Sequence, residues 1–229
     1  MTIPRRALGL LAGTALTLLA LGSGDVARGV EPRMEARCLP VSQRTSSVGC
    51  WIKAQESLGA LPQTPIFWQL STYPNLAAAK AAKSPGATVM EALDQVWLLT
   101  IGAAGARAPG GTSVAEIGPL PVKGGAQYTA QYMEAIFPPG AETRPHTHPG
   151  PEAWYHAAGG VCLETPEGKA FGRAGDNGFI VPGDRPMRLT VTGKDERRSI
   201  VLILHETGKP ASGFDTKWVP KGLCREDGS

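Results

Sequence analysis

Residues 140–159 read GAETRPHTHPGPEAWYHAAG and hold three of the four histidines in the chain. His146 and His148 are two residues apart, and in a β-strand such residues point to the same face with Cα atoms roughly 6.8 Å apart. Glu152 follows four residues later, which in a straight strand would carry it roughly 13 Å away. The proline-glycine-proline sequence at residues 149–151 favours a bend, because proline fixes φ and glycine permits unusual dihedral angles.

Such a bend would bring two imidazole nitrogens and one carboxylate to a common point. Two nitrogen donors and one oxygen donor suit a divalent transition metal ion and leave coordination positions open. We therefore expect His146, His148 and Glu152 to bind one such ion. Iron, manganese, zinc, nickel and copper all remain candidates.

The glycines, histidines and glutamate of residues 140–159 match the first motif of the cupin family at every fixed position, and the chain resembles a cupin there. Residues 175–187 resemble the second cupin motif, with one extra residue before the proline. Met187 stands where cupins usually place their last histidine ligand, so it also raises the alternative of a barrel without metal. The resemblance covers roughly residues 114–206.

The resemblance implies an all-β cupin fold, a double-stranded β-helix or jelly-roll barrel. The sequence agrees, because short strand patterns separated by Gly and Pro turns follow one another. The expected barrel strands are residues 114–117, 128–137, 143–148, 152–157, 161–164, 178–181, 187–191 and 200–205. Ahead of them, an N-terminal α+β elaboration is predicted, with strands at 49–54, 66–70, 88–92 and 96–101 and a helix at 76–83 capped by Asn75.

The expected order of parts is a signal peptide, an N-terminal region packed on the barrel, the barrel itself and a tail folded back on it. These parts are assigned to residues 1–27, 30–105, 106–209 and 210–229. Two arginines precede a short apolar run at the N-terminus, which is typical of a signal peptide and compatible with Sec or twin-arginine export. An uncleaved anchor is the alternative. We expect a periplasmic or extracellular protein.

Cys38, Cys50, Cys162 and Cys224 are an even set in a chain expected to be exported, which favours two structural disulfides. Four cysteines allow three pairings, and the sequence does not choose among them.

Further residues near the motifs are candidates for the site. His156 and His205 are candidate catalytic residues. His205 is a possible proton-transfer group, with a hydrogen-bonded core residue as the alternative. His156 is a possible contact for the substrate or support for the metal ligands, with a surface or packing role as the alternative. Trp154, Met187 and Arg144 are expected to line a substrate pocket. Arg185 and Arg188 also lie close enough to the motifs to meet an anionic substrate.

The net charge of +3 is spread along the 229 residues, so neither nucleic acid nor a membrane surface is expected as a partner. The resemblance leaves room for a homodimer. Two functions remain: a metalloenzyme that acts on a small organic molecule by oxygenase or Lewis-acid chemistry, and a non-enzymatic periplasmic protein that binds or senses a metal or small ligand. Cupins include both kinds, so the fold alone does not decide.

Overall fold

The computed structural model describes residues 37–225. The predicted signal peptide lies outside the described residues, as do residues 226–229. Among the described residues, no helix is long and apolar enough to cross a membrane.

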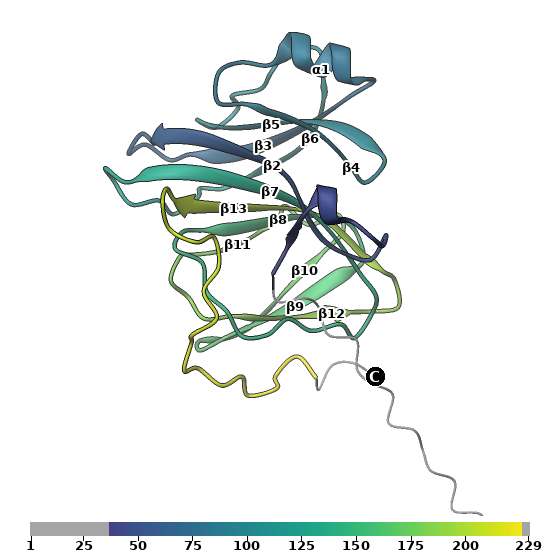
Figure 1. Ribbon diagram of the computed structural model, residues 1–229, viewed down its shortest axis with the longest axis vertical. Coiled ribbons are helices and arrows are strands. Elements are labelled where there is room, and N and C mark those ends of the chain that lie inside the picture. Colours follow the sequence, from purple (N-terminus) through teal and green to yellow (C-terminus); the bar gives the residue numbers. More distant parts are fainter. Residues whose placement is uncertain (1–36, 226–229) are drawn as a thin grey trace, which may run out of the picture. The chain divides into compact units, whose positions relative to one another are not determined.

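Three β-sheets form the fold, and the all-β prediction is confirmed (Figure 1). The six-stranded sheet has the order β1-β2-β7-β13-β8-β11, with strands Leu39–Pro40, Gly49–Ala60, Gln127–Phe137, Arg197–Glu206, Glu152–Ala158 and Phe179–Val181. The three-stranded sheet has the order β10-β9-β12, with strands Gly168–Arg173, Gly160–Thr165 and Arg188–Thr192. The four-stranded sheet has the order β4-β5-β3-β6, with strands Thr88–Ala92, Gln95–Gly102, Phe67–Tyr73 and Thr112–Ile117.

The six-stranded sheet lies between two cores, as the layers in Figure 1 show. Strand β13 demonstrates this, because alternate side chains of a strand point to opposite faces. Ile200 and Leu202 pack with Trp68 of the four-stranded sheet, whereas Val201 and Ile203 pack in the other core, against the three-stranded sheet. The second core is the interior of the barrel, and it is the one that reaches the predicted site.

The N-terminal region divides between two sheets. Strand β2 pairs with β7 and so extends the barrel's larger sheet, whereas β3, β4 and β5 form most of the four-stranded sheet. Strand β6 was expected in the barrel but pairs with β3. Helix α1, Leu76–Ala82, begins where predicted, because the Asn75 side chain accepts a hydrogen bond from the Ala78 amide at 2.9 Å. A short 3₁₀ helix, Val41–Gln43, lies between β1 and β2.

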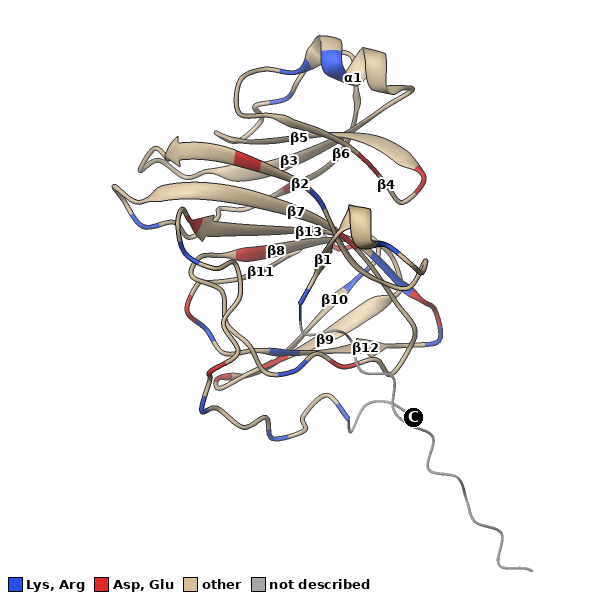
Figure 2. Cartoon of the chain, viewed as in Figure 1, with Lys and Arg blue, Asp and Glu red and all other residues tan. Residues whose placement is uncertain are grey.

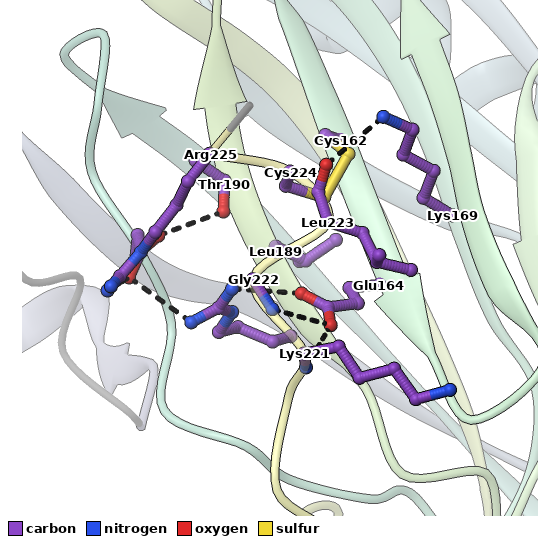
Figure 3. A network of polar contacts seen from close by, with 12 residues as sticks. Cys162, Glu164, Lys169, Leu189, Thr190, Lys221, Gly222, Leu223, Cys224 and Arg225 are labelled. Carbon is purple, nitrogen blue, oxygen red and sulfur yellow. Dashed lines mark hydrogen bonds and ion pairs between the residues drawn. A yellow bond between two sulfur atoms is a disulfide. The ribbon is translucent and has the colours of Figure 1, made fainter. Parts of the chain in front are cut away.

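The segment after β13 folds back along the barrel, and Figure 3 shows its last part. The Lys221 and Gly222 amides donate to Oε1 of Glu164, which is fully buried on β9. Cys224 forms a disulfide with Cys162 on the same strand. The other disulfide joins Cys38 to Cys50. The structure therefore has one of the three pairings that the sequence left open.

Figure 2 shows Lys/Arg and Asp/Glu interspersed over the described strands and loops.

Candidate metal centre

The segment that carries the two histidines runs beside β12 without forming a strand. It touches β12 and the residue before it through single bridges, one of which joins His146 to Met187. The predicted strand at residues 143–148 is therefore wrong. Pro145 and Pro149 explain the difference, because proline has no N–H to donate to a continuous ladder.

The predicted corner is present at residues 149–151. The Asp184 amide donates to the His148 carbonyl at 2.7 Å, and the Leu204 amide donates to the Pro151 carbonyl at 2.9 Å. Gly150 lies against β13 so closely that a Cβ there would be 2.0 Å from the Leu204 carbonyl oxygen. Only glycine fits at this position, and the corner leads directly into β8, whose first residue is Glu152.

The three predicted ligands come together at this corner. One ligand atom from each of His146, His148 and Glu152 lies within 4.8 Å of the other two. All three side chains are buried, and Nε2 of His148 lies 3.1 Å from Oε2 of Glu152. The convergence follows from the corner rather than from a shared strand face.

Backbone carbonyls fix the orientation of both imidazole rings. Nδ1 of His146 is 2.8 Å from the Arg144 carbonyl, and Nδ1 of His148 is 2.6 Å from the Ala211 carbonyl. A carbonyl can only accept, so each Nδ1 carries a proton, and in the neutral ring each Nε2 has a free lone pair. This is how metal-binding histidines are usually held.

Two of the converging atoms have no hydrogen-bond partner among the described residues: Nε2 of His148 and Oε2 of Glu152. The two atoms lie 3.1 Å apart and form an ion pair when His148 is protonated. Buried polar atoms without partners are rare, and a shared ligand explains two that face each other. The residues present therefore fit a divalent metal ion.

The electrostatics of the two histidines differ. Burial and the neighbouring His148 lower the pKa of His146 to about 4, although Glu152 opposes them. Burial is the largest influence on the pKa of His148 and acts to lower it, but the Glu152 carboxylate and the Ala211 carbonyl together raise that pKa. His146 is thus a neutral donor over most of the physiological pH range.

The three ligands line a cavity of about 600 Å³ inside the barrel. Its walls are partly apolar, with Met133, Phe137 and Val201, and Trp154 also lines it as predicted. The Cys38–Cys50 disulfide forms part of the wall, as do Ala211 and Ser212 of the tail. The N-terminal segment and the C-terminal tail therefore both contribute to the cavity wall.

The other two predicted pocket residues lie elsewhere. Met187 is buried in the barrel core and is not a lining residue of the cavity. Arg144 is exposed, with its guanidinium 5.7 Å from the ring centre of Phe214. Arg185 is ion-paired with Glu167 on the surface, so it does not meet the cavity either.

Neither of the other two candidate catalytic histidines lines the cavity. His156 is buried, with Nδ1 2.8 Å from the Ser199 hydroxyl, and burial together with Arg197 lowers its pKa to about 3. His205 is buried at the far end of β13, and burial lowers its pKa as well.

Sequence reasoning missed Arg197, which lines the cavity, and Ala211, which holds His148. Arg197 begins β13 and shares strand parity with Val201 and Ile203. Extending the predicted strand toward the N-terminus by three residues would have placed Arg197 on the barrel's inner face. No local signal marks Ala211.

No protein-family model matches the sequence, and no curated protein matches it significantly. Solved structures similar to part of it include a cupin-like protein from Thermotoga maritima, with 18% identity, coverage of 42% of this chain and 69% of that chain, and a TM-score of 0.35. An oxalate oxidase shows 21% identity, coverage of 38% and 46%, and a TM-score of 0.32. A DMSP lyase from Ruegeria pomeroyi shows 18% identity, coverage of 38% and 43%, and a TM-score of 0.33.

The similarity to the last two spans under half of either partner chain. The stronger features are those of the chain itself: two facing, mainly antiparallel sheets and a complete first motif whose three ligand residues converge. On these features, the chain has the fold of the cupin superfamily.

Proposed function

We propose that the protein is an exported metal-binding cupin that works as a metalloenzyme on a small organic molecule. The observation that carries the proposal is the convergence of His146, His148 and Glu152 on the wall of a 600 Å³ cavity. A volume of this size suits a small-molecule ligand.

The ligand atoms limit the reactions that the site can support, but they are compatible with iron, manganese, zinc, nickel and copper. Met187 packs in the core, so two nitrogens and one carboxylate are the protein's donors. When bound, a divalent ion supplies Lewis-acid or oxygenase chemistry at its open coordination positions.

The remaining tasks belong to the chain's own residues. The Arg144 and Ala211 carbonyls hold the Nδ1 protons of the two histidines, so that both Nε2 atoms stay available. Met133, Phe137 and Val201 give the cavity apolar walls, which exclude water and strengthen electrostatic contacts within it.

A non-enzymatic binding or sensing protein is the second candidate, and one observation favours it. Within residues 37–225, the cavity wall offers no carboxylate, histidine, tyrosine, lysine or free thiol besides the three candidate ligands. A reaction that needs a separate general acid or base would lack one there. A metal-centred reaction on the bound molecule would not need one.

Export is supported by the two disulfides, because such bonds persist in oxidising compartments. The proposed location is therefore the periplasm or the extracellular space. We propose a small-molecule partner, and neither nucleic acid nor a membrane surface after signal cleavage. A homodimer remains compatible with this proposal.

The metal site is tested by elemental analysis of the purified protein, followed by calorimetric titration of metal-free protein with each candidate ion. We expect one ion per chain, and a loss of affinity of about a hundredfold or more in His148→Ala and Glu152→Ala, since each removes one of three ligands. His205→Asn is the matched control, because it alters a buried histidine outside the cavity. Equal affinity in all four proteins would refute the site.

The two functions are then separated with the iron(II)-loaded protein. Dioxygen consumption or product formation on a panel of phenols, thiols and keto acids supports the enzyme. Tight metal retention without turnover, whichever ion is loaded, supports the binding protein.

A further inference from the structure

Among the described residues, Arg197 is a buried cation without an ion-pair partner. The residue is 2% exposed, and the one side-chain hydrogen bond found there runs from Nε to the Ser199 hydroxyl at 3.0 Å. Throughout residues 37–225, no carboxylate lies within ion-pairing distance of its guanidinium. Burial lowers the pKa of Arg197 to about 10, so the group is still charged at neutral pH.

Arg188 is a buried arginine that is held by ion pairs within the fold. Its guanidinium donates to Oε2 of buried Glu164 at 2.9 Å and lies 3.6 Å from Glu142. Buried charges are normally paired in this way, because an unpaired one is costly. The ion pairs of Arg188 account for its burial, whereas the burial of Arg197 without an ion pair requires another explanation.

Arg197 faces the same cavity as the candidate metal ligands. Glu152 is near enough to influence its pKa, yet the Glu152 carboxylate is engaged with His148 and the candidate metal position. The walls around Arg197 include Ala135, Phe137 and Val201, whose apolar side chains strengthen any charge interaction there.

A short chain of hydrogen bonds holds Arg197 in place. Arginine can only donate, so the Ser199 oxygen accepts from Nε of Arg197. In the described part of the chain, the only acceptor for the Ser199 hydroxyl proton is Nδ1 of His156, 2.8 Å away. His156 is thus a positioning residue, and the Nη atoms of Arg197 remain available to the cavity.

We infer that Arg197 binds the carboxylate of a small organic acid whose other end reaches His146, His148 and Glu152. The planar guanidinium offers two parallel N–H donors that match the two oxygens of a carboxylate. The inference deepens the proposed function and relies on it for the metal-facing end of the ligand. The role of Arg197 itself is testable without metal.

The test measures the binding of matched pairs of probes: benzoate against benzamide, phenylacetate against phenylacetamide, and inorganic phosphate as a second anion. Fluorescence of Trp154, which lines the cavity, reports binding in the metal-free and zinc-loaded protein. We expect each carboxylate to bind about tenfold or more tightly than its amide, because the amide lacks the charge and the second acceptor.

Arg197→Gln should weaken carboxylate binding by about tenfold or more, and Arg197→Lys by a smaller factor, because lysine keeps the charge but loses the planar fork. Arg198→Gln is the matched control: it removes the same charge from the next residue, whose side chain pairs with Asp94 at 3.0 Å. Circular dichroism shows whether each variant is folded. If Arg197→Gln does not fold, the comparison is made between wild type and Arg197→Lys.

Three results would overturn the inference: amides that bind as tightly as carboxylates, equal carboxylate binding by wild type and the Arg197 variants, and binding of phosphate in place of carboxylates. Metal content, measured separately, keeps this test apart from that of the proposed function. Carboxylate selectivity in a protein that binds no metal would refute only the metalloenzyme. A metal-binding protein without that selectivity would refute only the role of Arg197.

Discussion

The backbones of Gly150 and Gly183 are in contact, so that a Cβ on Gly183 would lie 2.6 Å from the Gly150 Cα. Gly150 forms the corner of the first motif, and Gly183 belongs to the second motif. The hydrogen bond from the Asp184 amide to the His148 carbonyl lies beside this contact. The two motifs thus support the metal centre together, through a direct contact between their glycine backbones.

Gly150→Ala should therefore disturb both the fold and the site. Its Cβ would be 2.0 Å from the Leu204 carbonyl oxygen, and the backbone must shift to relieve the clash. We expect a loss of unfolding free energy of about 1–3 kcal/mol and weaker metal binding. Urea denaturation and calorimetric metal titration measure the two effects. Gly102→Ala is the control, because its Cβ would meet Ala106 at an ordinary 3.5 Å; similar results for both variants would contradict the prediction.

Two arginine variants should change stability in opposite directions. Arg197→Met removes a buried charge that has no ion-pair partner among residues 37–225, so we expect unchanged or higher stability, by about 1 kcal/mol. Arg188→Met leaves buried Glu164 without its ion pair and should cost about 3–5 kcal/mol. Chemical denaturation measures both values. A large loss of stability in Arg197→Met would mean that its guanidinium is satisfied within the folded chain.

Removal of the Cys162–Cys224 disulfide should weaken the metal site as well as the fold. The bond spans 62 residues and anchors the tail whose Ala211 carbonyl holds His148. Replacing both cysteines by alanine should cost about 4 kcal/mol by loop entropy and lower metal affinity by about tenfold.

The Cys38–Cys50 pair is the control for that variant. It spans 12 residues, so its replacement by alanine should cost about 3 kcal/mol, and neither residue contacts a metal ligand through a hydrogen bond. Thermal unfolding and metal titration are compared for the two double variants. An equal loss of metal affinity in both would exclude a specific role for the tail.

His156 should make the fold sensitive to acid. Burial and Arg197 lower its folded pKa to about 3, against an ordinary value of 6.5, so the unfolded chain binds more protons between these values. Stability therefore rises with pH across this window and is lost as pH falls from 6.5 toward 3, by at most about 1.4 kcal/mol per pH unit.

The measurement is urea denaturation at several pH values from 7.5 to 4.5, for wild type and His156→Asn. The variant should show a shallower decline, because it removes one buried imidazole that must remain neutral. His146 and His205, whose pKa values are also lowered, stay in both proteins and cancel in the difference. Parallel profiles would contradict the prediction.

Most of the fold was predictable because its signals are local. The strand patterns of β4, β7, β8 and β9 lie within a few residues of their predicted bounds, and Asn75 marks the start of α1. Strand β10, Gly168–Arg173, has a weaker local signal, since five of its six residues are partly or fully exposed and it carries no buried run. The assignment of β6 to the four-stranded sheet depends on pairing with β3, which no local pattern encodes.

The metal-ligand residues of the candidate site were predictable from the sequence, but the backbone geometry that brings them together was not. The spacing of His146, His148 and Glu152 identifies the ligands, although Pro145 and Pro149 prevent the strand that the spacing of the two histidines predicts. The partners that complete the site come from distant positions. Ala211 lies 63 residues beyond His148. Arg197 follows other charged residues in the sequence and looks like part of a surface turn, but in the structure it is the first residue of β13.

The Cys38–Cys50 bond has a consequence beyond its contribution to stability, because both half-cystines belong to the wall of the ligand cavity. It ties the segment around Leu39 to β2, and that segment helps to enclose the interior of the barrel. We therefore expect oxidation of this pair to limit how far the interior of the barrel opens to solvent. The same polypeptide, produced where thiols stay reduced, should build the same sheets around a more accessible interior.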